Sequence, residues 1–123
     1  MHLFGPPIQG LAMKIAIVIS TNDPETVWNA FRFGSTSLAY DNEVTIFLMG
    51  KGIEALSSGT IKFDINAQLE IFNESGGNII GCGVCLENRQ EEMPYLREDL
   101  KCEMGSMQQF YSLVAESDKV VSF

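Results

Sequence analysis

Two thiols lie three residues apart in the segment Gly81-Cys82-Gly83-Val84-Cys85. The segment follows the apolar run Asn78-Ile-Ile, which is typical of a strand, and a helix is expected to begin after it. Glycines on both sides of Cys82 expose backbone N–H groups, and a helix N-terminus would favour the thiolate, the form of cysteine that attacks sulfur. Cys82 is therefore the first candidate for a reactive residue, with Gly81 and Gly83 as its backbone surroundings.

The same spacing suggests a reversible disulfide between Cys82 and Cys85, as in a dithiol redox switch. A thioredoxin motif, however, follows an early strand and is usually led by an aromatic residue, whereas this one is led by Gly81. Cys102 is a third thiol, expected at the carboxyl end of a further strand, from which it approaches Cys82 across the sheet edge. The alternative for each cysteine is a small buried apolar side chain or an incidental thiol.

Polar residues also follow the two earlier strands. Asn22 comes shortly after the run 14–20, and Gly50 and Lys51 follow the run 43–49. Because ligands of parallel sheets bind beyond the carboxyl ends of the strands, these three residues are expected to line the same edge as the thiols. The alternative for the Gly50-Lys51-Gly52 segment is an ordinary turn.

Several other chemistries lack their sequence signals. No glycine-rich phosphate-binding motif is present, so no nucleotide cofactor is expected. The lone histidine, His2, stands far from the thiols in sequence, which argues against a hydrolase triad. One Cys-x-x-Cys pair without a second pair is a poor zinc signature, so no metal ion is expected either.

Alternating strand and helix patterns predict an α/β domain, a three-layer sandwich with a mostly parallel sheet of about five strands and helices on both faces. The expected strands are 14–20, 43–49, 78–82, a weak 100–103, and 119–123. Three helices are expected after the capping residues Asp23, Asp64 and Ser106, and a short helix with a loop within 86–98. The first helix has an apolar stripe at Val27, Ala30, Phe31, Gly34 and Leu38, and the last has one at Met107, Phe110, Tyr111 and Val114.

The 123 residues fit one domain, expected over 13–123, preceded by an N-terminal arm, 1–12, that is expected to be poorly ordered. Sixteen acidic and eight basic residues give a net charge of −8, which disfavours binding to nucleic acid or anionic membranes. Because no apolar run is long enough to span a membrane and no signal-peptide pattern is present, a cytoplasmic location is expected. An odd number of cysteines agrees with a reducing compartment.

Residues 14–123 resemble the DsrE/DsrF-like family of sulfur-relay proteins, which includes the TusD-type subunits. The resemblance rests on the opening strand run, on Val44-Thr-Ile-Phe-Leu-Met-Gly50, on Gly76-Gly77-Asn78-Ile-Ile-Gly-Cys82, and on the closing segment 105–123. It implies a small α/β fold, assembly into trimers or hexamers, and a cysteine at the position of Cys82 that receives sulfane sulfur as a persulfide and passes it to a partner protein. Cys85 is not generally needed by relay subunits, which keeps the dithiol switch open, and a non-enzymatic module that binds a small ligand is a further alternative.

Two kinds of partner are expected. Large apolar residues beyond the needs of the core, such as Trp28, Phe33 and Met49, add to the expectation of a homo-oligomer. The segment 86–99 combines apolar and acidic residues close to the thiols, and it is expected to be a flexible, exposed contact for a basic sulfur donor or acceptor protein. Its apolar members are Leu86, Met93, Tyr95 and Leu96.

Overall fold

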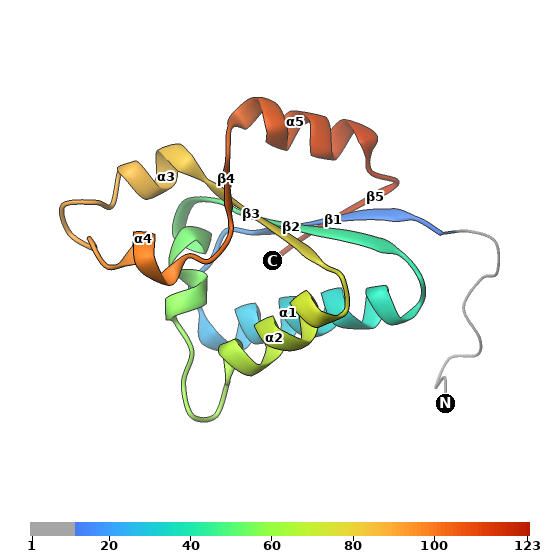
Figure 1. The fold of residues 1–123 in the computed structure, drawn as a ribbon, viewed down its shortest axis with the longest axis horizontal. Helices are drawn as coiled ribbons and strands as arrows, with labels where there is room; N and C mark the ends of the chain where they lie inside the picture. Colours follow the sequence, from blue (N-terminus) through green and yellow to red (C-terminus); the bar gives the residue numbers. More distant parts are fainter. Residues whose placement is uncertain (1–11) are drawn as a thin grey trace.

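A five-stranded parallel sheet forms the centre of the protein in the computed structural model, which describes residues 12–123 (Figure 1). The strands are β1 (Lys14–Ile19), β2 (Glu43–Leu48), β3 (Asn78–Cys82), β4 (Glu103–Gly105) and β5 (Lys119–Ser122), arranged in the order β4-β3-β2-β1-β5. All four neighbouring pairs are parallel, which confirms the predicted fold class. The predicted arm lies, except for Ala12, outside the described residues.

Helices connect the strands and lie on both faces of the sheet. They are α1 (Pro24–Ala39), α2 (Ile65–Glu74), α3 (Gly83–Glu87), α4 (Leu96–Asp99), α5 (Met107–Glu116) and the 3₁₀ helix η1 (Gly50–Ser57). Figure 1 shows α1 and α2 together on one face, α5 alone on the other, and α3 and α4 at one end of the sheet. None of the described helices has the length and apolar character needed to cross a membrane.

The three predicted helix caps are confirmed. The Asp23 carboxylate accepts a hydrogen bond from the Thr26 N–H, and the Asp64 carboxylate accepts one from the Ala67 N–H. Ser106 and Gln109 form a reciprocal capping box at the start of α5. Each cap satisfies backbone donors that the first helical turn leaves without partners, so these sites fix where the helices begin.

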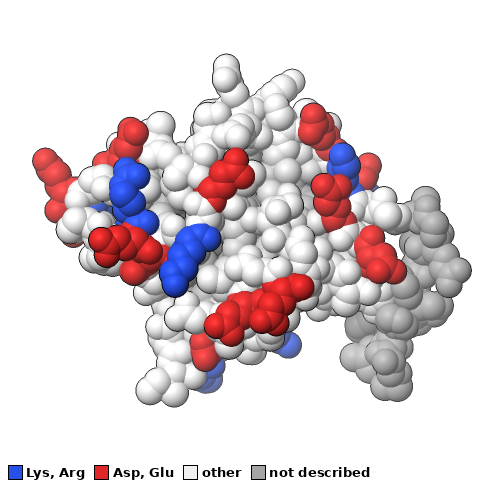
Figure 2. All heavy atoms as spheres, in the orientation of Figure 1, with Lys and Arg blue, Asp and Glu red and all other residues white. Residues whose placement is uncertain are grey.

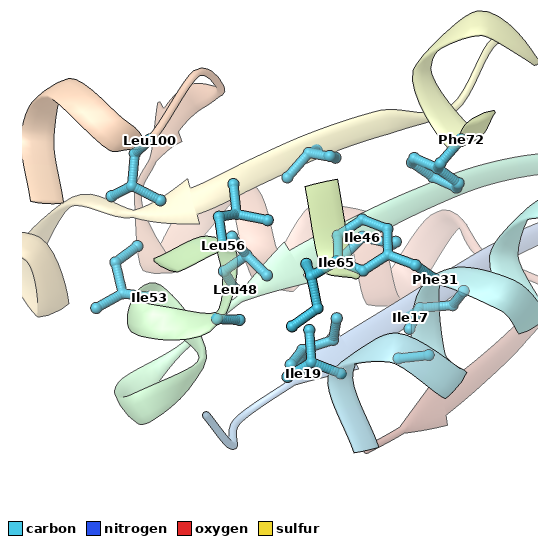
Figure 3. Close-up of a cluster of buried hydrophobic side chains, with 14 of the residues drawn as sticks. Ile17, Ile19, Phe31, Ile46, Leu48, Ile53, Leu56, Ile65, Phe72 and Leu100 are labelled. Carbon is cyan, nitrogen blue, oxygen red and sulfur yellow. The ribbon is translucent and has the colours of Figure 1, made fainter. Parts of the chain in front are cut away.

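The main hydrophobic core lies between the sheet and the α1–α2 layer (Figure 3). Ile17 and Ile46 of the sheet are fully buried there beneath Phe31 and Phe72. The two phenylalanine rings meet edge to face, with centroids 5.7 Å apart. A Cβ atom on Gly34 would lie 2.9 Å from the Phe72 ring, so this glycine allows α1 and α2 to approach each other closely.

Two parts of the chain differ from the sequence prediction. The predicted strand 100–103 exists but its bounds are wrong, because β4 begins only at Glu103 and Leu100 is buried in the core beside η1 (Figure 3). Helix η1 was not predicted at all; its Ile53 and Leu56 are buried three residues apart, the period of a 3₁₀ helix. Apolar residues in both segments therefore extend the core instead of forming a strand or an open loop.

The prediction for residues 86–99 is also wrong in part. Leu86 and Leu96 are buried in the core, and Met93 packs against it from a partly buried position. Only Tyr95 of the four predicted patch residues is an exposed apolar side chain. Buried apolar residues attach the segment to the core, and most of its solvent-exposed side chains are charged.

Candidate functional site

The carboxyl ends of β1, β2 and β3 lie level with one another. Ile19 pairs with Leu48, and Leu48 pairs with Gly81, so the residues that follow these strands meet at one edge of the sheet. Gly50 at the start of η1 and Cys82 at the start of α3 are both at this edge. The structure therefore brings together the segments that the sequence selected as candidates.

Cys82 occupies the junction between β3 and α3. It is the last residue of the strand and the N-cap of the helix, and its Sγ accepts a hydrogen bond from the Cys85 N–H at 3.4 Å. The residue is only 5% exposed. A Cβ atom on Gly81 would point at Ile53 of η1 and Met104 of β4, which belong to the core on the α1–α2 side of the sheet, so the next residue, Cys82, faces the α5 side.

Burial raises the pKa of the Cys82 thiol above its ordinary value, and the neighbouring Cys85 thiol raises it further. Hydrogen bonds from the backbone of Cys85 and Val84 act in the opposite direction but do not outweigh the burial. The expected thiolate-favouring effect of the helix N-terminus is therefore overcome. The physical reason is that α3 is five residues long, with few aligned peptide dipoles, while the sulfur is nearly shielded from water.

Cys85 lies beside Cys82 in the first turn of α3 and connects it to the end of β2. Its Sγ accepts a hydrogen bond from the Gly50 N–H at 3.2 Å. Gly50 has a φ of 55°, a left-handed conformation that suits glycine. Between the two cysteines, the Val84 side chain is exposed to solvent. The site thus consists of two adjacent sulfurs, one nearly buried and one partly buried, next to an exposed apolar residue.

Cys102 does not join this pair. It precedes β4 instead of following a strand, and its Sγ is 3.4 Å from the position that a Cβ of Gly81 would take. That position is on the α1–α2 side of the sheet, opposite Cys82. Burial raises the pKa of the Cys102 thiol to about 11, partly offset by a backbone hydrogen bond from Gly81. The expected approach of Cys102 to Cys82 is therefore wrong, because the two side chains face opposite sides of the sheet.

An ion pair at the sheet edge was missed by the sequence analysis. The Arg89 Nε donates to the Glu54 carboxylate at 2.7 Å, and the Asn22 amide donates to the same carboxylate at 3.1 Å. Arg89 also donates from Nη1 to the carbonyl oxygen of Cys85 at 3.0 Å. This Asn22–Glu54–Arg89 cluster ties the loop after β1, helix η1 and the backbone of the thiol-bearing turn together.

The electrostatics of this cluster favour the ionised carboxylate. The Arg89 hydrogen bond is the main cause that lowers the pKa of Glu54, and the nearby positive charge of Lys51 contributes to the same shift. Lys51 itself is exposed at the sheet edge. Asn22, Gly50 and Lys51 were predicted at this edge, whereas Glu54 and Arg89 are 35 residues apart and carry no sequence signal beyond their opposite charges.

A metal centre finds no support among residues 12–123, which contain no group of three or more His, Cys, Asp or Glu side chains suited to hold an ion. His2, the one histidine of the sequence, lies outside the described residues.

The fold and the site together define a small α/β protein with a parallel sheet and a glycine-flanked thiol pair at the end of its third strand. The chain belongs to the DsrE/DsrF-like family, whose model matches residues 13–123. This family is generally associated with sulfur relay.

The chain is also similar to two proteins of methanogenic archaea and, in its fold, to one solved structure. The chain is 31% identical over 117 residues to an uncharacterized protein of Methanocaldococcus jannaschii, covering 90% of this chain and 100% of the relative. It is 30% identical over 114 residues to an uncharacterized protein of Methanopyrus kandleri, covering 89% and 93%. The solved structure of a conserved protein of unknown function from Bacteroides thetaiotaomicron matches with a TM-score of 0.70 and 18% identity, covering 89% of this chain and 94% of that one.

Proposed function

We propose that this protein relays sulfur, with Cys82 as the residue that carries it in the form of a persulfide. The observation that carries the proposal is the position of the Cys82 Sγ, at the end of a central parallel strand and fixed by the Cys85 N–H. Sites of parallel α/β sheets lie at this edge. The family membership supports sulfur relay as the general activity, and the geometry supports Cys82 as the residue.

The transfer is an exchange of sulfur–sulfur bonds and needs no cofactor. In the first step, the Cys82 thiolate attacks the outer sulfur of a donor persulfide; a bond forms to the Cys82 Sγ, and the donor thiolate leaves with the electron pair of the broken bond. In the second step, an acceptor thiolate attacks the outer sulfur on Cys82, and the Cys82 thiolate leaves. The sulfane sulfur keeps its oxidation state throughout.

The burial of Cys82 affects the two steps differently. Loading requires the formation of a thiolate on a nearly buried sulfur with a raised pKa, so burial slows this step at neutral pH. Once loaded, the outer sulfur stands about 2 Å beyond Sγ, the length of one sulfur–sulfur bond. The carried sulfur is therefore easier to reach than the thiol that received it.

A basic donor or acceptor protein is the partner that fits the surface around the site. Residues 64–123 hold eleven acidic and four basic residues, and acidic side chains lie, with Lys and Arg among them, at the end of the molecule that carries α3 and α4 (Figure 2). Exposed Val84 and Tyr95 supply apolar contacts among exposed acids such as Glu87 and Glu91. Apolar contacts within a charged rim are typical of protein interfaces.

A second copy of this chain is the partner that fits the surface of α5. Met107 and Tyr111 are 62% and 73% exposed, and Val120 of β5 is exposed on the same side of the sheet. Glu116 is the one charged residue of α5. Two copies that each carry a net charge of −8 repel one another, so an uncharged apolar surface is the place where they can associate. The protein is therefore proposed to be a homo-oligomer, a trimer or a hexamer.

The relay proposal is tested with single-thiol variants. In the first, Cys85 and Cys102 are replaced by Ser so that Cys82 is the one remaining thiol; in the matched control, Cys82 and Cys85 are replaced so that Cys102 remains. After incubation with glutathione persulfide and removal of the donor, the first variant is expected to gain about 32 Da, the mass of one sulfur atom, and the control to gain nothing.

The second half of the experiment adds an acceptor thiol to the loaded Cys82-only variant. Loss of the added mass, with appearance of a persulfide on the acceptor, supports relay. A Cys82-only variant that is folded by circular dichroism yet gains no mass overturns the proposal and favours a binding module in which Cys82 has only a packing role.

A further inference from the structure

The two sulfurs at the sheet edge are placed for reaction with each other. The Cys82 Sγ accepts a hydrogen bond from the backbone N–H of Cys85, which brings it against the first turn of α3. The Cys85 thiol is close enough to Cys82 to raise the pKa of the Cys82 thiol, and its sulfur accepts a hydrogen bond from the Gly50 N–H. Both cysteines are free thiols in the structure. No rearrangement of strands or helices is needed to bring them together.

Disulfide geometry is compatible with this arrangement after a small shift. Residues three apart on a helix have Cβ atoms about 5–6 Å apart, whereas a disulfide needs a separation of about 3.5–4.5 Å. Cys82 is the N-cap and has extended backbone angles, with φ −70° and ψ 115°. Because Cys82 is the junction between β3 and α3 and not a residue of the helix interior, a small change in its backbone angles can supply the difference while α3 stays formed.

Access also favours the intramolecular partner. Cys82 is nearly buried, so the thiol of a large acceptor protein has little access to its sulfur. Cys85 is already in contact with it. Cys102 is excluded from this role because its sulfur lies on the α1–α2 side of Gly81, across the sheet from Cys82.

We propose that Cys85 is a resolving thiol, which discharges the Cys82 persulfide as sulfide and leaves a disulfide between Cys82 and Cys85. This inference rests on the proposed function, since it requires that Cys82 first accept a sulfane sulfur. It adds a second outcome to the relay. When an acceptor is docked, the outer sulfur passes to it; when none is docked, the protein itself reduces the sulfur.

The step balances in atoms and electrons. The Cys85 thiolate attacks the inner sulfur, the Cys82 Sγ, and a bond forms between the two cysteine sulfurs. The bond from the Cys82 Sγ to the outer sulfur breaks, and its electron pair leaves with hydrosulfide. The two cysteines are oxidised to a disulfide, and the sulfane sulfur is reduced to sulfide. The proton of Cys85 passes to solvent or to the departing hydrosulfide.

One discharge needs no external reductant, but a second one does. The disulfide must be reopened by a dithiol reductant, such as a thioredoxin-type protein or dithiothreitol, through ordinary thiol–disulfide exchange. Reduction resets the pair to the two free thiols seen in the structure. In the absence of such a reductant the reaction stops after a single sulfur per chain.

The Asn22–Glu54–Arg89 cluster supports the pair without touching the sulfurs. Arg89 binds the carbonyl oxygen of Cys85 and the carboxylate of Glu54 at the same time. Through these bonds the turn that carries Cys85 is anchored to η1, whose first residue, Gly50, holds the Cys85 sulfur. Arg89 is thus a positioning residue for the resolving thiol.

A single-turnover experiment tests the inference. The reduced full chain is exposed to a slight excess of glutathione persulfide, the donor is removed by rapid desalting, and released sulfide, free thiols and protein mass are followed without reductant. The wild type is expected to release about one equivalent of sulfide and to lose about 2 Da, the two hydrogens of a dithiol, leaving Cys102 as the one free thiol. Cys102→Ser, the matched control, is expected to release sulfide to the same extent.

The Cys85→Ser chain separates the two proposals. It is expected to keep the added sulfur on Cys82 and to release little sulfide, at least tenfold less than the wild type. If this variant gains no sulfur, the proposed relay itself fails. If both it and the wild type keep the added sulfur and the wild type retains the thiol of Cys85, relay stands and the resolving role of Cys85 is overturned. Migration of the added sulfur to Cys85 also overturns that role.

Discussion

The two faces of the sheet are covered very differently. On one face, α1 and α2 pack side by side over Ile17, Ile46 and the other inward residues of the strands, and the layer between the helices and the sheet consists of buried apolar side chains (Figure 3). On the other face α5 lies alone, and none of its ten residues is buried (Figure 1). One of its contacts with the sheet is Phe110 against Phe47, with ring centroids 4.7 Å apart.

This difference shows what an apolar stripe on a helix does and does not predict. The stripes of α1 and α5 follow the same helical spacing, yet Val27, Ala30 and Phe31 are fully buried while Met107 and Tyr111 are largely exposed. A helix with a neighbour on the same face is closed off from water on two sides, whereas a single helix leaves both flanks open. The α1–α2 face stabilises the chain; the α5 face is available for contact with another chain.

The largest effect is expected from truncation in the α1–α2 face. Phe72→Ala removes a fully buried ring that contacts Phe31 and is expected to lower the free energy of unfolding by about 3–5 kcal/mol. Tyr111→Ala, the matched truncation on α5, is expected to cost less than about 0.5 kcal/mol in the isolated subunit, because the ring is already 73% exposed. Urea denaturation measures the free energy of unfolding of both variants at a protein concentration where the subunits are dissociated. Equal losses of stability in the two variants would contradict the contrast between the two faces of the sheet.

The next effect concerns assembly. Replacing Met107 and Tyr111 together by Glu places charges on the uncharged surface of α5 and is expected to reduce the mass measured by light scattering from that of an oligomer to that of one chain. The circular dichroism spectrum should be unchanged, since neither side chain is buried. Ile61→Glu is the control, because Ile61 is a fully exposed apolar residue on the loop before α2. A monomeric wild type, or a double variant that still assembles, would refute self-association through α5.

Much of the fold was predictable because local signals and tertiary packing agree. The Asp23, Asp64 and Ser106 caps mark helix starts, and the β-branched runs of β1 and β2 mark strands that are covered on both faces. The predicted bounds of β4 were wrong, because this three-residue edge strand is too short to show a period. In this segment Leu100 was interpreted as a strand residue, although it is buried in the core beside η1. No local sequence pattern distinguishes an apolar side chain in a strand from one in a loop that packs on the core.

The sequence predicted where the site residues follow the strands, but not which distant residues contact one another. The position of Cys82 after β3 follows from the strand run and the flanking glycines, and Gly50 was expected at the same edge because it follows β2. The contact between Arg89 and Glu54 was not predictable, since it joins two loops through the fold. Nor did the spacing show that Cys102 and Cys82 face opposite sides of the sheet, because this depends on the register of β4 against Gly81.

The free energy of unfolding is expected to depend on pH through the thiol of Cys102, which lies on the α1–α2 side of the sheet. Because burial raises the pKa of Cys102 from 9.0 to about 11, the folded state favours the neutral thiol. The resulting stabilisation is present below the unfolded pKa of 9.0 and is lost as the pH rises through about 11. The wild type is therefore expected to lose more stability than Cys102→Ser between pH 8 and pH 11, by urea denaturation at each pH. Cys82, whose pKa is also raised, contributes equally to both proteins, so it does not affect the difference.

Alkylation offers a second readout for the same thiol. In the chain with Cys102 as its one cysteine, iodoacetamide labelling under native conditions is expected to rise about tenfold per pH unit from pH 8 to pH 10, since the thiolate is the reactive form. A rate that levels off near pH 9 would show that Cys102 is as accessible to water as a free thiol and would contradict its burial behind the sheet.

The smallest effect is expected at the sheet edge, where the Glu54–Arg89 pair joins α3 to the α1–α2 side of the molecule. The two side chains are 17% and 21% exposed, between a surface pair and a buried one, so Glu54→Gln is expected to lower the free energy of unfolding by about 1 kcal/mol at pH 7. The Arg89 hydrogen bond lowers the pKa of Glu54, so this stabilisation is present above the unfolded pKa of 4.5 and is lost as the pH falls through the lower folded value. The difference between wild type and variant should therefore narrow below pH 4, while Glu87→Gln, which changes an exposed acid on α3, should leave stability unchanged at both pH values. If the stability lost in Glu54→Gln is independent of pH, the Glu54 side chain acts through its shape and not through its charge. The sheet edge would then be stabilised by packing, as the α1–α2 face is.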